Sequence, residues 1–134
     1  MKEYRSQRIF RLSSFNPTHR QLTLRSDPGT PEEGGLRIEF YFGNVSYLAL
    51  QPLLRGIAVR RATPEEQASL GDRFGIPADQ REYIFLVTDG SPVCFVVSGE
   101  PSWRQAERRV DDPSLFDFGQ PWPPTTDMEW GSIE

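Results

Sequence analysis

The sequence has very few of the side chains that most metal and catalytic centres use. Among 134 residues there is one histidine, His19, and one cysteine, Cys94. A structural zinc site takes four Cys or His ligands, so one of each cannot build it. Cys94 lies in the apolar stretch PVCFVV, where burial disfavours a reactive thiolate. We therefore expect no metal, no cofactor and no enzymatic activity, and keep a hydrolase using His19 as a third hypothesis.

Long apolar runs are also missing. No uninterrupted apolar stretch approaches the roughly 20 residues that cross a bilayer. The first residues, MKEYRSQRIF, carry charges where a secretory signal needs an apolar block. A single cysteine cannot form an intramolecular disulfide. These features predict a soluble, cytoplasmic protein without a membrane partner.

Charge is unevenly distributed along the chain, whose formal net charge is −4. Residues 1–25 hold six basic residues and one acidic residue, whereas residues 111–134 hold six acidic residues and no basic one. Opposite charges at the two ends favour docking of the tail on the first strands, or two separate faces for partners. The arginine doublets 60–61 and 108–109 are candidates for nucleic-acid contact. A pI near 5.1 and the acidic tail argue against it, so we expect no nucleic-acid partner.

Alternating and apolar segments predict β-strands. In 36–42 (LRIEFYF), apolar side chains alternate with Arg37, Glu39 and Tyr41, which indicates one buried face and one wettable face. Residues 45–50 then look like its hairpin partner, and 21–26 alternates in the same way. In 83–99, two apolar runs flank Asp89-Gly90, which predicts a hairpin with a tight two-residue turn and both faces covered.

Two segments favour helices. Thr63, Pro64 and Glu66 form the pattern of a capping box with proline at the first helical position, and Gly71 is expected to end that helix. In 102–110, the spacing of Trp103, Ala106 and Val110 favours a second helix over a return strand. The expected fold is mainly β: a single antiparallel rolled sheet or small sandwich of about six or seven strands, with one or two short helices.

Residues 1–113 form the predicted mainly-β domain, and residues 114–134 form an acidic segment rich in proline and aromatic side chains. Prolines at 113, 121, 123 and 124 enforce an extended path. One interpretation is a strap that lays Phe116, Phe118 and Trp122 on apolar positions and turns Asp117 toward an N-terminal arginine. The other is a docking surface for a basic partner, and the two can coexist. The partner-contact candidates are Phe116, Asp117, Phe118, Trp122, Asp127, Glu129 and Trp130.

The stretches SSFNPTHRQLTLRS, YFGNVSYLALQPLLRGIAV and DDPSLFDF resemble small uncharacterised bacterial proteins of mainly-β character, some of which accompany toxin systems. The resemblance covers about half of the chain and brings no catalytic motif. It implies a stand-alone protein-binding domain, in its narrowest form an immunity-like protein that neutralises a basic toxin.

The first hypothesis is therefore a non-enzymatic domain whose partner is another protein, with a homodimer through an edge at 36–42 left open. The alternative is a β-domain that binds a small apolar ligand. Its predicted lining residues are Tyr41, Tyr47, Tyr83 and Phe85.

Overall fold

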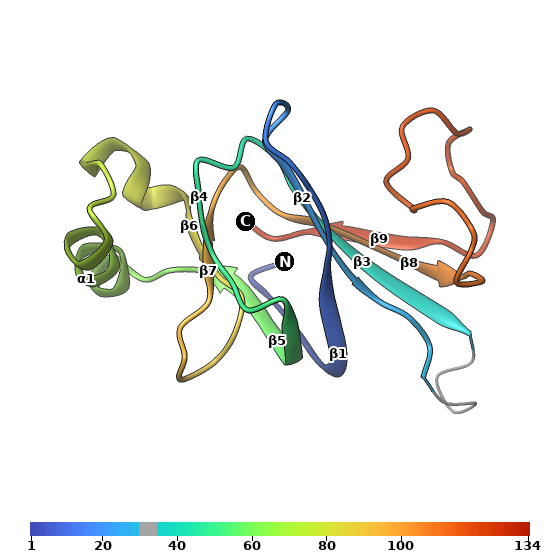
Figure 1. Ribbon diagram of the computed structural model, residues 1–134, viewed down its shortest axis with the longest axis horizontal. Helices are drawn as coiled ribbons and strands as arrows, with labels where there is room; N and C mark the ends of the chain where they lie inside the picture. The colour runs from blue at the N-terminus through green and yellow to red at the C-terminus, as the bar shows by residue number, and fades with distance from the viewer. Residues whose placement is uncertain (30–34) are drawn as a thin grey trace.

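The computed structural model describes residues 1–29 and 35–134. These residues form nine strands and two helices (Figure 1). In chain order the elements are β1 (Glu3–Asn16), β2 (Gln21–Ser26), β3 (Leu36–Phe42), β4 (Tyr47–Ala49), β5 (Leu53–Arg61), α1 (Pro64–Phe74), the 3₁₀ helix η2 (Ala78–Tyr83), β6 (Ile84–Leu86), β7 (Phe95–Val97), β8 (Ser102–Glu107) and β9 (Glu129–Ser132). The mainly-β, antiparallel character is confirmed, with more strands than the six or seven expected.

All nine strands belong to one antiparallel sheet in the order β4-β7-β6-β5-β1-β2-β3-β8-β9. Residues 36–41 pair with 102–107, and residues 47–49 pair with 95–97. Residues 36–49 therefore pair with residues 95–107 in two places: through β3 and β8 near one end of the strand order, and through β4 and β7 at the other end. The sheet must curve back on itself for one stretch of chain to reach both places. The connection between β3 and β4 carries the chain onward in about the same direction. Asn44, within it, has a left-handed backbone conformation with φ 52°.

The strand pairing contradicts two of the expectations from the sequence. Residues 45–50 are not the hairpin partner of 36–42, because β4 pairs with β7. Strand β3 is not a sheet edge either, because β2 and β8 pair with its two sides. The homodimer that would use an edge at 36–42 therefore has no free edge there.

The inner face of the curved sheet holds the main hydrophobic core. The alternation predicted in 21–26 and 36–42 is confirmed, since Leu22, Leu24 and Phe40 are completely buried. Side chains from β1, β5, β6 and β7 join them in one cluster. Each such side chain contributes about 1.5–3 kcal/mol on burial, so this face is the main source of stability.

The hairpin of β6 and β7 is confirmed, with both strands buried on both faces. Its turn is longer than Asp89-Gly90. The ladder ends where the Val87 amide donates to the Cys94 carbonyl (2.9 Å), and the Cys94 amide then donates to the hydroxyl of Thr88 (3.3 Å). Pro92 has no N–H for a ladder, so the chain forms a wide loop instead.

Helix α1 begins as predicted. The Thr63 side chain accepts from the Glu66 amide and the Glu66 side chain accepts from the Thr63 amide, which is a complete capping box. The predicted end at Gly71 is wrong: the helix continues to Phe74 and is capped by Gly75 at φ 67°. Gly71 is buried within the helix because the Arg81 side chain lies directly on it, where a Cβ atom would clash.

The helix expected at 102–110 is wrong, because residues 102–107 form strand β8. The three-residue spacing of Trp103 and Ala106 places them on opposite faces of that strand. Trp103 packs against Tyr4 on the inner side, with ring centroids 5.2 Å apart. Ala106 packs with Leu115 and Met128 in a separate cluster. Because both faces of β8 are covered, apolar side chains occur on both faces, and their spacing along the sequence resembles that of a helix.

Candidate functional site

The segment between β8 and β9 leaves the sheet as a large loop at one end of the molecule (Figure 1, orange). Residues 109–122, called the strap here, lie on the outer face of β2, β3 and β8. The strap rests on apolar positions only in part, where Leu115 packs with Ala106 and Phe116 stacks on Tyr41. The strap is held mainly by a buried ion pair, Arg37 and Glu39, which are 0% and 1% exposed. The face of β3 expected to be wettable is thus covered by the strap.

Arg37 and Glu39 hold the strap through its backbone. The Arg37 guanidinium donates to the carbonyls of Arg109, Asp112 (3.2 Å) and Pro113 (3.0 Å). The Glu39 carboxylate accepts from the Ser114 hydroxyl (2.6 Å) and the Leu115 amide (2.7 Å).

The charges of the pair are balanced within the same cluster. Arg37 lies 3.6 Å from Glu39 and 3.4 Å from Asp27. Burial lowers the pKa of Arg37 below its ordinary value, and neighbouring Arg25 lowers it further. Because buried charges are costly unless paired and hydrogen-bonded, the pair and the strap depend on each other.

Arg104, on β8, binds the middle of the strap. Its guanidinium donates to the Leu115 carbonyl (2.7 Å) and lies between the rings of Phe116 (4.3 Å) and Trp122 (4.4 Å). Phe116 is itself buried and stacks on Tyr41 with centroids 5.3 Å apart. Each cation–π contact stabilises by about 0.5–2 kcal/mol, so this sandwich fixes the strap in place.

Three large aromatic side chains in and around this sandwich remain more than half exposed. Phe118, Trp122 and Trp130 are 66%, 56% and 57% exposed, and we call these three the aromatic surface. Trp122 and Trp130 contact each other edge to face at 5.6 Å, although they are eight positions apart in sequence. Trp130 is opposite Arg104 in the β8–β9 ladder, which brings it to the outer face.

The three candidate acids have different roles. Asp127 accepts from the Glu107 amide (2.9 Å), and this hydrogen bond lowers its pKa below the ordinary value. Asp117 does not face an N-terminal arginine as expected. Its carboxylate accepts from the Gly119 amide (3.0 Å) because the strap turns tightly there. Asp117 is exposed next to Phe118, whereas Glu129 is exposed on the face of β9 opposite to Trp130.

A groove of about 500 Å³ separates the strap from the end of the β1–β2 hairpin. We call it the aromatic groove; it is lined by Phe15, Tyr41, Phe116 and Phe118 together with the polar side chains of Gln21 and Thr23. Only Tyr41 of the four ligand-binding candidates lies in this groove. Sequence reasoning missed Phe15, Gln21 and Thr23, because the outward face of β2 becomes part of a groove only once the strap is in place.

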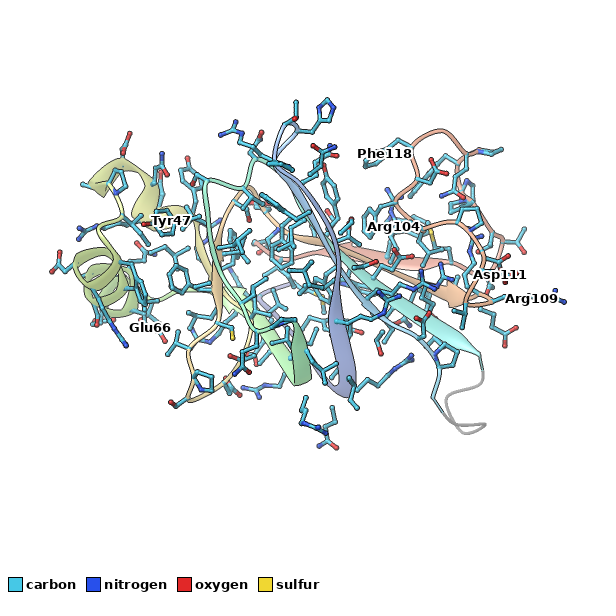
Figure 2. All side chains as sticks on the ribbon, viewed as in Figure 1. Tyr47, Glu66, Arg104, Arg109, Asp111 and Phe118 are labelled. Atoms are coloured by element: carbon cyan, nitrogen blue, oxygen red, sulfur yellow. The ribbon has the colours of Figure 1, made fainter. Side chains whose placement is uncertain are left out.

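The other three ligand-binding candidates lie elsewhere. Phe85 is completely buried in the core with Arg61 over its ring (4.7 Å). Tyr47 is exposed and its hydroxyl donates to the Phe74 carbonyl at the end of α1 (3.2 Å). Figure 2 shows Tyr47 on the α1 side of the molecule, far from Phe118. Tyr83 lines a shallow hollow with Ser46 and Gln80. The four candidates thus do not surround one cavity.

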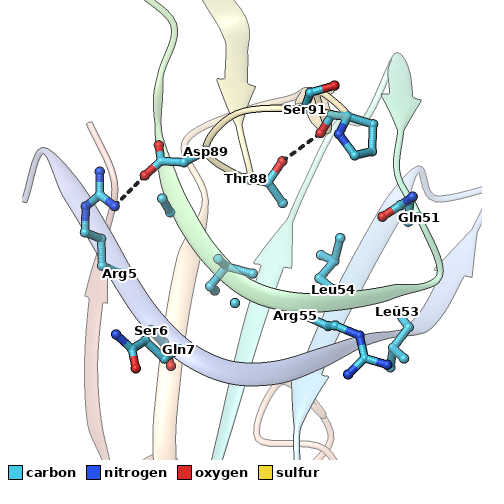
Figure 3. A pocket seen from close by; sticks show the side chains of 14 residues that line it. Arg5, Ser6, Gln7, Gln51, Leu53, Leu54, Arg55, Thr88, Asp89 and Ser91 are labelled. Atoms are coloured by element: carbon cyan, nitrogen blue, oxygen red, sulfur yellow. Dashed lines mark hydrogen bonds and ion pairs between the residues drawn. The ribbon is translucent and has the colours of Figure 1, made fainter.

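A second groove, of about 520 Å³, lies where β1 and β5 lose their regular register (Figure 3). Gln7, Gln51 and Arg55 line it, and Arg5 crosses it to pair with Asp89 of the β6–β7 loop. Arg5 also pairs with Glu3. The charges of Arg5 and Asp89 neutralise each other, so Arg55 is the exposed charge that lines this groove.

His19 lies in the turn between β1 and β2, where its amide donates to the Asn16 side chain (3.1 Å). Its imidazole makes no hydrogen bond with another residue in the described part of the chain. Cys94 is buried in the core. Within residues 1–29 and 35–134 no three His, Cys, Asp or Glu side chains are grouped to hold a metal ion.

No protein-family model, curated protein or solved structure matches this chain. The resemblance to toxin-associated bacterial proteins therefore stays a hypothesis. Neither helix in the described ranges is both long and apolar enough to cross a membrane.

Proposed function

We propose that this chain is a non-enzymatic protein-binding domain whose partner is a basic protein. One observation carries the proposal: the aromatic surface of Phe118, Trp122 and Trp130 is more than half exposed while its framework is firmly anchored. Exposed aromatic patches of this kind are costly in water and are typical of sites that a partner covers. Tryptophan and other large aromatics supply much of the binding energy in such interfaces.

The anchoring supports the proposal. Arg37, Glu39 and Arg104 bind four backbone carbonyls and one amide of the strap. A partner would therefore meet a surface that is already ordered. Because ordering side chains and loops on association lowers affinity, this preorganisation favours tight binding.

Charge selects the class of partner. Residues 111–134 contain six acidic residues and no basic one, and Asp117 is exposed next to Phe118 of the aromatic surface. Acidic side chains around aromatic anchors speed association with a basic surface and reject acidic ones. In its narrowest form the proposal is a bacterial, cytoplasmic, immunity-like protein that masks a basic toxin domain.

The test compares three baits in an affinity capture from the source organism: the natural chain, Trp122→Ala/Trp130→Ala, and the distant control Tyr47→Phe. We expect a basic protein that the natural chain and the control retain and the double variant loses. Calorimetry with that purified protein should show weaker binding for Asp117→Asn, and the loss should shrink at high salt. A captured protein that is acidic, or that the double variant retains equally, would contradict the proposal.

A further inference from the structure

The aromatic groove is a second feature of the strap region, and it shares only Phe118 with the aromatic surface. Three parts of the chain form it: the end of β1, the outer face of β2 and β3, and the strap. Tyr41 stacks on Phe116 at an interplanar angle of 21°, and Phe118 meets Tyr41 edge-on at 5.7 Å. These contacts build a fixed aromatic wall, because Phe116 is held by Arg104 and Tyr41 belongs to a central strand.

The lining carries no charge. None of the ten described residues that line the groove is acidic or basic, in a chain of which 25% is charged. A charged ligand, such as a phosphate ester or a carboxylic acid, would lose hydration there without gaining a counter-charge. The groove therefore favours a neutral ligand.

The polar side chains of the lining have unused hydrogen-bonding capacity. The amide of Gln21 and the hydroxyls of Thr23 and Tyr41 make no hydrogen bond with another residue among the described ranges. Each of these groups both donates and accepts. An entirely apolar ligand would cover them without replacing their hydrogen bonds to water, which is unfavourable.

We propose that the aromatic groove binds a neutral saccharide. The apolar C–H face of a sugar ring would stack on the exposed rings of Phe15 and Phe118, which line the groove beside the Tyr41–Phe116 stack. Its hydroxyls would exchange hydrogen bonds with Gln21 and Thr23. A proline-rich peptide also stacks on aromatic rings, but it lacks N–H donors at its prolines. It would leave the acceptor oxygens of Gln21 and Thr23 unpaired, so the hydroxyl-rich ligand fits better.

The test is an NMR titration of the full isotope-labelled chain with cellobiose, maltose and diacetylchitobiose at millimolar concentrations. We expect saturable shifts for at least one sugar, centred on residues 14–16, 21–23 and 116–118. Gln21→Leu/Thr23→Val preserves side-chain size and strand preference while removing the polar groups. Loss of two hydrogen bonds should weaken binding about tenfold or more.

Trp130→Ala is the matched control, because Trp130 belongs to the aromatic surface and does not line the groove. It should bind sugar normally while losing the protein partner, and Gln21→Leu/Thr23→Val should do the opposite, so the two proposals fail separately. Absence of saturable shifts with all three sugars would overturn the saccharide proposal. Equal binding by the Gln21 and Thr23 variant would do so too.

Discussion

At the scale of single residues, Arg37 and Glu39 explain how the strap comes to be ordered. They lie two positions apart on one face of β3, and the strap satisfies their hydrogen bonds with its own backbone. Removing one member of a buried pair leaves an uncompensated charge, which is far more costly than losing an exposed ion pair. The same two residues therefore support both the fold and the presentation of the aromatic surface.

Arg37→Met should lower the free energy of unfolding by about 3–5 kcal/mol, because Glu39 would stay buried without its cation. Arg55→Met is the control: Arg55 is exposed on β5, and its loss should change stability by about 0.5 kcal/mol or less. Urea unfolding followed by circular dichroism measures both. Equal, small changes in the two variants would contradict the structural importance of the pair.

The burial of this pair was not predictable from local sequence. Alternation in 36–42 correctly gave the inner face, but it assigned Arg37 and Glu39 to water. The residues that cover them lie some 75 positions later in the chain, and no short-range pattern reports such a contact. One signal was present: two opposite charges on the same face of a strand interior. The sequence placed Phe116 and Phe118 in the strap but could not show that Phe116 is buried and Phe118 exposed, because that depends on how the strap turns.

At the scale of elements, α1 shows where local chemistry is sufficient. Thr63, Pro64 and Glu66 define its start because a capping box acts within four residues. Its end and strand β8 show the opposite case. Gly71 stays helical because Arg81 packs on it, and β8 is a strand because β3 requires a partner. Tertiary contacts determine where α1 ends and why residues 102–107 form a strand, so local propensity and residue spacing could not predict either.

The start of α1 also gives a pH-dependent prediction. The hydrogen bonds from Arg60, helped by the Thr63 amide, lower the pKa of Glu66 from 4.5 to about 2. A carboxyl group with a lowered pKa stabilises the fold above its unfolded pKa and loses this effect as the pH falls through its folded pKa. For Glu66 the loss should fall between about pH 4.5 and pH 2.

We therefore expect Glu66→Gln to be less stable than the natural chain by about 1 kcal/mol above pH 5, since the pair is partly exposed and screened. The difference should shrink toward zero as the pH approaches 2. Urea unfolding of both proteins at several pH values measures it, and the comparison cancels the other carboxyl groups. A difference that stays constant down to pH 2 would mean that the Glu66 charge does not contribute.

At the scale of the whole molecule, the two ends of the chain meet. The Met1 ammonium donates to the Ser132 carbonyl (3.1 Å), and Lys2 pairs with Glu134 (3.4 Å). These contacts place the oppositely charged ends of the chain next to each other, although exposed ion pairs of this kind contribute little to stability, and β9 is held by its pairing with β8. Leu115 and Ile133 are completely buried, so residues 114–134 complete the same domain as the sheet.

Deleting residues 114–134 should therefore abolish cooperative folding, because it removes β9, uncovers Arg37 and Glu39, and opens both apolar clusters that Leu115 and Ile133 fill. The informative comparison replaces residues 119–126 with a Gly/Ser linker of the same length. That variant keeps β9 and the contacts that Arg37 and Glu39 make with the strap, and it loses Trp122 with its contact to Arg104. It should unfold cooperatively with a melting temperature only a few degrees lower, since about 1 kcal/mol shifts the melting temperature of a domain this size by roughly 4 °C. A cooperative transition in the deletion variant would show instead that residues 1–113 fold without the strap, and the preorganisation argument for the aromatic surface would fail with it.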